Sequence, residues 1–349
     1  MGHQGNAVAN ATIRQGAPGV AEIIRYGSYV PKYRAPLPEI QAFHGRPGRP
    51  RSRALATPAL DEDSLTMAYE AAAEAAAGQD APAAVVTLTL SAPFGLRKMS
   101  ATLARALDLP AGTAAYDVAG HPGSLLDAVQ LAGALSERDG GTALVVVSDH
   151  QVSYEDRVCD TLSAGGATAL LVGGSGGFAR LGPIARAGNE VYDVWRLGTE
   201  PEARYRLEVL FDAYGKAAKG ALSTLERLTE RPAGKYAAVC ASQPHPQTLR
   251  ALGRLGVSDA QLEGTSFVAN IGNLGAASLG LALALGFDRA RKGQQLLAFG
   301  YGGGEGIAQE IEITKAPPKI GIADRVAAGE AITLGTYYRW TKGRQVEPH

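Results

Sequence analysis

The polar, glycine-punctuated stretch Asn270–Ser278 is the part of the chain best suited to hold a reacting group. It opens directly into the Ala- and Leu-rich run Leu279–Leu285. Small residues let a backbone loop press close to a ligand, while the helix that follows buries itself completely. Asn273 at its centre could donate a hydrogen bond to a reacting group, or satisfy backbone groups in a tight turn. The stretch predicts one wall of a ligand site.

The two cysteines, Cys159 and Cys240, are the candidate nucleophiles. Two cysteines cannot form a disulfide scaffold, and no CxxC spacing suggests a structural metal. Cys159 lies in a polar segment between predicted strands and could be reactive, although free cysteines in cytosolic proteins are usually inert. Cys240 ends a predicted buried strand, so we expect it in the core.

Two further stretches suggest anion binding. Gly300–Gly306 looks like a phosphate cradle, but it lacks the Lys and the Ser or Thr of a Walker motif, which favours a close-packed turn. The basic stretch Arg46–Arg53 could hold a CoA phosphate or the acidic face of a partner, and a solvated loop is the simpler interpretation.

Composition narrows the class of protein. The chain has 349 residues, 46% of them hydrophobic and 19% charged, which is enough for a large core in one big or two ordinary domains. A formal net charge of zero argues against binding to nucleic acid or to an anionic membrane. Residues 1–19 lack an apolar h-region and read as a flexible leader. The apolar run Ala276–Phe287 is too short to span a bilayer, so we expect a soluble cytoplasmic protein.

The elements that must position these residues follow from the hydrophobic pattern. Near-continuous apolar strands alternate with helices, which predicts an α/β fold with a buried sheet. The second half repeats the element order of the first, which suggests a duplication. We expect irregular surface over Pro31–Pro58. Strands are predicted at 23–30, 83–90, 113–118, 143–148, 167–173, 180–186, 236–240, 295–301 and 310–314. Helices are predicted at 65–77, 96–107, 123–135, 201–228, 246–255 and 274–287.

Several of these segments resemble the thiolase superfamily, which includes 3-oxoacyl-ACP synthase III and hydroxymethylglutaryl-CoA synthase. Asn270–Ser278 is similar to the family's Gly-Asn-x-x-Ala-Ala-Ser loop. Arg25–Arg34 and Asp61–Ala68 resemble the opening strand and following helix start of the synthases, and Gly165–Gly173 resembles their Gly-Asp-Gly-Ala strand. The resemblance implies a duplicated thiolase fold with five αβαβα layers. It divides the chain into a leader at 1–19, an N-terminal half at 20–178, a C-terminal half at 179–315 and an interaction tail at 316–349.

The resemblance also implies a Cys-His-Asn site, of which this chain keeps little. In the family a thiolate at the head of a buried helix attacks an acyl thioester, and the helix N-terminus lowers the thiol pKa. Counting from Asp117 places Pro122 at the Cys position, and an offset would place His121 or Ser124 there. The family's His corresponds to Ser242, with His245 three residues later. Only the Asn of the set is retained, as Asn273.

The remaining groups at this degenerate site leave two interpretations open. His121 could act as an acid or base, although capping or packing is the simpler role for a His before Pro. Ser124 could replace the nucleophile, yet no Gly-x-Ser-x-Gly elbow surrounds it, and a Ser at a helix N-terminus is the default. Without a nucleophile, residual oxyanion donors supply only a small acceleration. We therefore expect a catalytically silent paralogue, with an enzyme that uses a non-standard site as the alternative.

The resemblance further implies partners. Tyr192–Trp195 and the closing quartet Tyr337, Tyr338, Arg339 and Trp340 resemble synthase-like subunits of multi-component acyltransferases, which serve secondary metabolism or the mevalonate route. The expected partners are a thiolase-type catalytic subunit and a zinc-ribbon/OB-fold subunit, with the quartet as an interface anchor. A homodimer or pseudo-dimer is also expected. No cofactor is expected, with acyl-CoA or an acyl carrier as possible substrate, and a stand-alone acyl-binding or regulatory protein is a third possibility.

Overall fold

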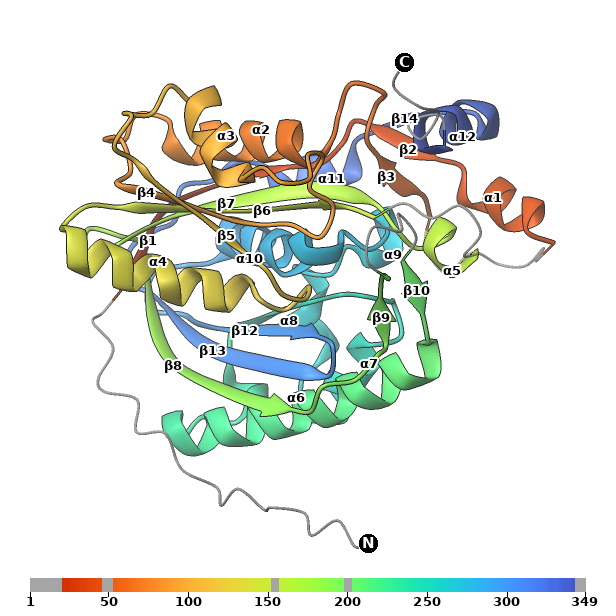
Figure 1. Cartoon of the computed structure of the whole chain (residues 1–349). Coiled ribbons are helices and arrows are strands. Elements are labelled where there is room, and N and C mark those ends of the chain that lie inside the picture. Colours follow the sequence, from red (N-terminus) through yellow and green to blue (C-terminus); the bar gives the residue numbers. More distant parts are fainter. Residues whose placement is uncertain (1–20, 46–52, 152–156, 198–202, 343–349) are drawn as a thin grey trace, which may run out of the picture.

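The computed structural model of the protein describes residues 21–45, 53–151, 157–197 and 203–342. Two α/β halves are stacked on each other, with helices above, between and below two layers of strands (Figure 1). The first half runs through β1 (Glu22–Tyr29), α2 (Ser64–Ala76), β4 (Ala84–Leu88), α3 (Met99–Ala106), β5 (Ala114–Val118), α4 (Leu125–Asp139), β6 (Ala143–His150), α5 (Arg157–Asp160) and β7 (Gly165–Gly173).

The second half begins directly after β7, and residues 198–202 are its only segment before residue 343 that the structure does not describe. Its strands are β8 (Ala179–Gly188), β9 (Val194–Trp195), β10 (Arg204–Tyr205), β11 (Ala238–Ala241), β12 (Gln295–Gly302) and β13 (Glu305–Ile313). Its helices are α6 (Leu207–Thr229), α7 (Leu249–Gly253), α8 (Asp259–Glu263), α9 (Val268–Ile271) and α10 (Ser278–Arg289), with 3-10 turns η1 (Ala233–Lys235) and η2 (Gly275–Ala277).

The strand order shows how the two halves are related. Nine strands share one sheet in the order β11-β12-β13-β8-β1-β7-β6-β4-β5. Numbered in chain order within each half, the five strands of the first half lie in the order 3-2-4-5-1 and the four strands of the second half in the order 2-3-4-1. The second order equals the first with its third strand left out, and the parallel and antiparallel neighbours are the same. The halves join where β1 meets β8 through only two residue pairs. Within the described residues of the second half, α7, α8 and α9 stand where a third strand would lie.

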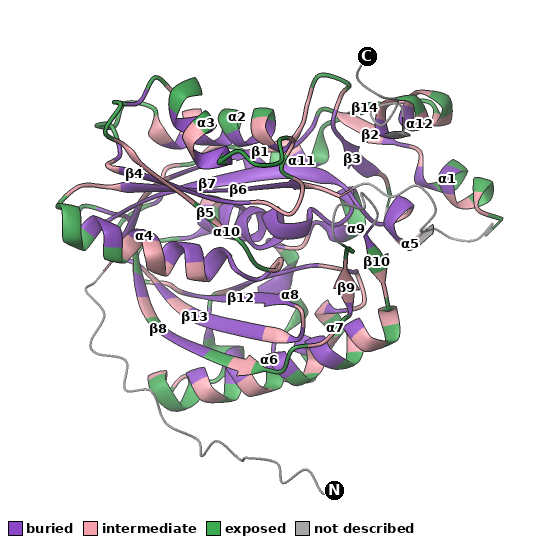
Figure 2. Cartoon of the chain, in the orientation of Figure 1, coloured by how far each residue is buried: buried purple, intermediate pink, exposed green. Residues whose placement is uncertain are grey.

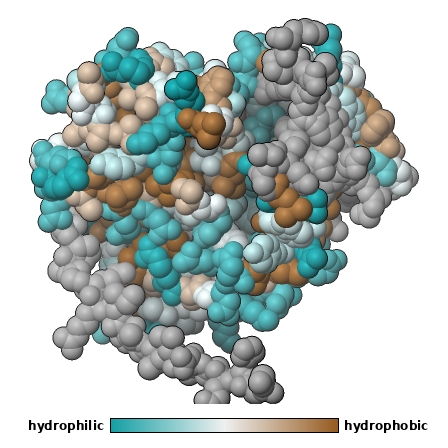
Figure 3. All heavy atoms as spheres, in the orientation of Figure 1, coloured by the Kyte–Doolittle hydropathy of each residue, from teal (hydrophilic) through white to brown (hydrophobic). Residues whose placement is uncertain are grey.

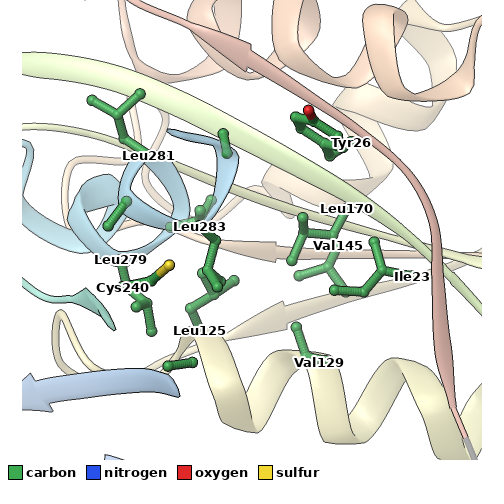
Figure 4. Packing of buried hydrophobic residues seen from close by; sticks show 14 of the residues in the cluster. Ile23, Tyr26, Leu125, Val129, Val145, Leu170, Cys240, Leu279, Leu281 and Leu283 are labelled. Atoms are coloured by element: carbon green, nitrogen blue, oxygen red, sulfur yellow. The ribbon is translucent and has the colours of Figure 1, made fainter. Parts of the chain in front are cut away.

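The helix α10 forms the centre of the molecule. Every residue from Ser278 to Phe287 is buried, as the purple central helix of Figure 2 shows. Its Leu side chains pack against strands of the first half and against Cys240 of β11 (Figure 4). Burial of each such Leu contributes about 1.5–3 kcal/mol relative to exposure. Gly280 is required at the closest approach, because a Cβ there would lie 2.7 Å from the Cβ of Thr168. The predicted buried helix is confirmed.

The start of α2 illustrates how the sequence sets a helix boundary. The Asp63 carboxylate accepts hydrogen bonds from the backbone N–H groups of Leu65 at 2.9 Å and Thr66 at 2.8 Å. The Thr66 hydroxyl accepts the Asp63 N–H in return at 2.7 Å. This reciprocal capping box satisfies donors that the first turn leaves open. It confirms the helix start predicted from the acidic run before Leu65.

The expectation of irregular surface over Pro31–Pro58 was wrong where the structure describes it. A three-stranded sheet forms from β2 (Tyr33–Ala35), β3 (Leu55–Thr57) and β14 (Glu330–Ala331), flanked by α1 (Leu37–Phe43), α11 (Ile322–Ala327) and α12 (Leu334–Lys342). Pro is tolerated in the first turn of α1 because the N–H that it lacks would have no partner there. Leu37 and Ile40 then pack on Leu55 and Tyr337.

The small sheet joins the chain's C-terminal segment to the first half of the molecule. β14 pairs with β2 through Glu330 and Ala331, which ties 316–342 to the N-terminal half. The predicted leader at 1–19 and most of the basic stretch Arg46–Arg53 lie outside the described residues. No helix in the described part of the chain combines the length and apolarity needed to cross a bilayer.

Candidate functional site

A cavity of about 450 Å³ opens where three strands of the first half end. β4 runs parallel to both β5 and β6, so their carboxyl ends meet at one edge of the sheet. Loops at this edge of a parallel sheet converge on a common crevice. The β9 strand of the second half closes the opposite side. The lining residues are Thr89, Leu90, Ala92, Ala119, Gly120, His121, Pro122, Gln151, Val194, Trp195, Arg196 and Ala203.

The loop before α4 presents His121 and Pro122 to this cavity. The Nδ1 atom of His121 accepts the backbone N–H of Gly123 at 3.0 Å, and its Nε2 atom lies 2.8 Å from Glu305 Oε2. An accepting Nδ1 leaves the ring proton on Nε2, which therefore donates to the Glu305 carboxylate. Both ring nitrogens are thus engaged within the protein. His121 bridges the head of α4 to the start of β13.

Ser124 is committed to the same loop. Its hydroxyl accepts the backbone N–H of His121 at 3.3 Å, and the residue is 5% exposed. It stands at the N-cap position of α4, but its hydroxyl bonds the preceding His121 and not the helix N–H groups, and it does not line the cavity. Neither of the residues that an offset alignment would place at the nucleophile position is free in this arrangement.

The glycines of Gly300–Gly306 form the close-packed turn that the sequence favours. A Cβ on Gly302 would lie 2.5 Å from His121 Nδ1, and one on Gly300 would lie 2.6 Å from the carbonyl oxygen of Gly123. Backbone of the β12–β13 hairpin therefore presses directly on the head of α4. This contact holds Glu305 in reach of His121.

Ser242 and His245 occupy the second half of the site and do not line the cavity. The Ser242 hydroxyl accepts the backbone N–H of Tyr301 at 3.2 Å, and its carbonyl accepts the Tyr214 hydroxyl at 3.0 Å. His245 is 5% exposed, and its Nδ1 accepts the backbone N–H of Gln247 at 3.1 Å. Its ring packs edge-on against Phe211. Both side chains therefore make structural contacts.

Asn273 also makes a structural contact. Its Oδ1 accepts the backbone N–H of Gly275 at 3.0 Å, and its backbone pairs with Leu162 and Ala164. These bonds fix the turn that leads into α10, which is the turn role considered for this residue. Asn273 does not line the cavity that His121 and Pro122 line.

The sequence interpretation missed Asp149 at the end of β6. Its buried carboxylate accepts the Ser91 hydroxyl at 2.5 Å and the backbone N–H of Ala276 at 2.9 Å. Burial raises the pKa of Asp149, against the opposing effect of these hydrogen bonds. Asp149 thereby ties the first half to the turn before α10. The available signal was a charged residue that follows six strand residues without charge.

Both cysteines lie in packed interior. The Cys159 Sγ is 3.2 Å from the Ser163 hydroxyl, and Cys159 is 1% exposed. Cys240 is fully buried, and desolvation raises the pKa of its thiol to about 12. Neither thiol lines the cavity. No group of three His, Cys, Asp or Glu side chains in the described residues is arranged to hold a metal ion.

The four residues of the predicted interface lie on α12. Tyr337 is 5% exposed and packs inside the small sheet's core, and its hydroxyl reaches the Asp160 carbonyl at 3.4 Å. The Trp340 ring meets Tyr33 edge-on, and Tyr338 meets the exposed Phe43. Arg339 is exposed. Tyr338, Arg339 and Trp340 of α12 are thus less buried than Tyr337.

Comparisons with known proteins agree with this architecture. No family model matches the chain. A hydroxymethylglutaryl-CoA synthase from Methanocaldococcus jannaschii is 26% identical over 320 residues, covering 86% of this chain and 91% of the relative. A solved hydroxymethylglutaryl-CoA synthase complexed with CoA matches with a TM-score of 0.83 at 16% identity, over 92% of this chain and 90% of the other. The 3-oxoacyl-(acyl carrier protein) synthase III of Pseudomonas aeruginosa matches with a TM-score of 0.77 at 22% identity, over 86% of this chain and 100% of the other.

The chain therefore has the mixed α/β thiolase-type fold predicted from its sequence. Over most of its length its sequence is similar to hydroxymethylglutaryl-CoA synthases.

Proposed function

We propose that the chain is a synthase-like subunit that binds an acyl thioester, carried on CoA or on an acyl carrier, without forming a covalent acyl intermediate. The supporting observation is the head of α4, where His121 and Pro122 face a cavity of about 450 Å³ and no thiol lines it. A cavity at the end of three strands with no nucleophile can hold a thioester but cannot take up its acyl group.

Two further features fit a binding role. Both nitrogens of His121 are engaged, and Ser242 and Asn273 are bonded to backbone, so no described side chain of the degenerate site is poised as a base. A solved structural neighbour is complexed with CoA, and another, an HMG synthase, is in complex with an acetyl donor-ACP. Acyl thioesters of these two kinds are therefore the ligands to test.

The proposed assembly supplies the missing chemistry from other chains. In it a thiolase-type subunit contributes the reactive Cys, and a zinc-ribbon/OB-fold subunit contacts α12 through Tyr338, Arg339 and Trp340. Aromatic side chains with Arg are typical of interface anchors. The edge strand β5 has only β4 as a neighbour among the described residues, so it is available for a homodimer or pseudo-dimer.

Intact-mass spectrometry after incubation with acetyl-CoA tests this proposal. We expect unchanged mass and, in a parallel titration, saturable binding of a non-hydrolysable acyl-CoA that Trp195→Ala weakens. Co-expression with candidate partner subunits should recover a complex that the α12 variant Arg339→Glu weakens. A stoichiometric acetyl adduct would contradict the proposal, as would the absence of any binding.

A second candidate function is favoured by one observation, the hydrogen bond between His121 Nε2 and Glu305 at the cavity wall. A carboxylate that orients an imidazole is a common arrangement for general acid–base catalysis, and Nδ1 would be the base once its hydrogen bond from the Gly123 N–H opens. If the chain catalyses turnover alone, His121→Ala and Glu305→Gln should each abolish it, with wild-type binding of the acyl-CoA analogue retained.

A further inference from the structure

A second cavity of about 380 Å³ lies on the other side of the α9 loop, away from the His121 cavity. Its walls come from β2, from the two residues before β3, from the C-terminal ends of α8 and α10, from α9 and from α11. The lining residues are Arg34, Arg53, Ala54, Glu263, Gly264, Ser266, Asn270, Ile271, Leu285, Arg289, Ala323, Val326 and Ala327. It shares no lining residue with the first cavity.

The second cavity is lined by more positive than negative side chains, although the chain as a whole has no net charge. Three arginines and one glutamate line it, whereas the whole sequence has 34 basic and 34 acidic residues. Arginines elsewhere in the molecule meet carboxylates, as in Arg325–Glu74 and Arg231–Glu310. In the part of the chain that the structure describes, the guanidinium groups of Arg53 and Arg289 have neither a carboxylate nor a hydrogen-bond acceptor, and Glu263 pairs with neither.

Arg34 adds positive charge that no carboxylate balances. Its guanidinium donates to backbone carbonyls, including those of Tyr33 at 3.1 Å and Arg325 at 3.1 Å. Carbonyls satisfy its N–H groups but leave its net charge uncompensated. Burial lowers the pKa of Arg34, which is the expected direction for a desolvated cation without an ionic partner.

The position of Arg289 is set by a glycine. A Cβ on Gly264 would lie 2.5 Å from Arg289 Nε and 2.9 Å from its Cζ, so the guanidinium lies directly on the backbone of Gly264. Below the charged rim, the floor is apolar and well packed. Ile271 is 1% exposed, Leu285 4% and Val326 8%. The site thus combines exposed guanidinium donors with an apolar surface, as small-molecule sites combine polar and apolar groups.

We infer that this cavity binds a small organic anion, with a phosphate ester or carboxylate held by Arg53 and Arg289 and an apolar body on Ile271, Leu285 and Val326. A guanidinium suits either anion, because its planar fork donates two parallel hydrogen bonds. Asn270 and Ile271 are on the segment that continues into Asn273, so the bound anion would contact the loop that enters α10. This inference does not depend on the proposed acyl-thioester function.

Calorimetric titration of the full chain tests the inference, with phenyl phosphate, benzoate and uncharged benzyl alcohol as probes. We expect one of the two anions to bind in a 1:1 ratio and benzyl alcohol to bind much more weakly. Preference for phenyl phosphate would identify a phosphate-ester site, and preference for benzoate a carboxylate site. Arg289→Gln should weaken the preferred anion about tenfold or more, because it removes a charge-assisted contact.

Two variants separate the cavity from general surface charge. Arg291→Gln removes an exposed arginine near the same helix end that does not line the cavity, and it should leave affinity unchanged. Gly264→Ala keeps every arginine but displaces the Arg289 guanidinium, and it should weaken binding in a protein whose thermal unfolding stays cooperative. The inference is overturned if neither anion binds better than benzyl alcohol, or if Arg289→Gln and Arg291→Gln bind equally well.

Discussion

Thiol chemistry offers the most direct test of the structure's account of the site, because both cysteines are buried away from the His121 cavity. Burial raises the pKa of Cys240 from 9.0 to about 12. At pH 8 the thiolate fraction then falls from about one in ten to about one in ten thousand, so chemical reactivity drops by about a thousandfold before access is considered. Cys159 is 1% exposed and is held against Ser163.

The assay is reaction of the native protein with a disulfide reagent at pH 8, followed by absorbance and then by denaturation. We expect no rapid labelling of the folded protein and release of two thiols on unfolding. Leu96→Cys, at a fully exposed position, is the matched control and should add one fast thiol. Pro122→Cys places a thiol at the head of α4 inside the cavity, where the helix N-terminus stabilises the thiolate, so it should also react quickly.

The result that refutes this reasoning is fast, stoichiometric labelling of one wild-type cysteine, especially if acyl-CoA protects it. Such a thiol would be both ionised and accessible, and a covalent acyl intermediate would become possible. Slow labelling that tracks global unfolding supports the structure.

Three further predictions concern stability. Gly286→Ala should lower the unfolding free energy by about 1–3 kcal/mol, because the added Cβ would lie 2.6 Å from Cys240 Sγ. Adding Cys240→Ala removes that sulfur and should recover part of the loss. Denaturant unfolding of the two single variants and the double variant measures this. His121→Ala should cost less than about 1 kcal/mol through loss of the hydrogen bond from Nε2 to Glu305, because the Glu305 side chain is 40% exposed to water. A far larger cost would show that this contact is effectively buried. Burial raises the pKa of Asp149 above 3.8, so at a given pH the folded state binds more protons at this carboxyl than the unfolded state does. The unfolding free energy of wild type, measured relative to Asp149→Asn, should therefore fall as pH rises above 3.8 and then level off. A difference that rises with pH would contradict this.

Patterns of residues close together in the sequence were sufficient to predict most of the long helices and strands. Apolar runs such as Ala143–Ser148 predicted buried strands, the uncharged run after Ser278 predicted α10, and the acidic residues before Leu65 predicted the start of α2. These signals work because each depends on residues close together in the chain. The small sheet was missed because β2, β3 and β14 have only two or three residues each, too few to show a period.

The candidate site was predictable only in part. The resemblance to the thiolase superfamily predicted that His121 or Pro122 stands at the position of the reactive residue, and both residues line a cavity in the structure. The hydrogen bond of His121 to Glu305 joins residues 184 positions apart, so no local spacing could reveal it. The same holds for Asp149, whose partner N–H on Ala276 lies 127 positions away. Side chains that work by spanning the two halves leave no local pattern.

The similar strand order of the two halves places two comparable loops near the centre of the molecule. In the first half β5 leads into the loop of His121 and Pro122 and then into α4; in the second half α9, which stands in place of a third strand, leads into the loop of Asn273 and then into α10. The two loops are therefore equivalent positions that enter the two central helices. Each loop satisfies its polar atoms within the protein, through Glu305 and Gly123 in one and through Gly275 and Asp149 in the other. Replacing a strand by α9 also frees Asn270 and Ile271 from sheet pairing, and these are residues that line the arginine-rich cavity. The same departure from exact repetition thus contributes one wall of a second cavity, whose other walls include Arg34, Arg53 and Ala54 of the first half.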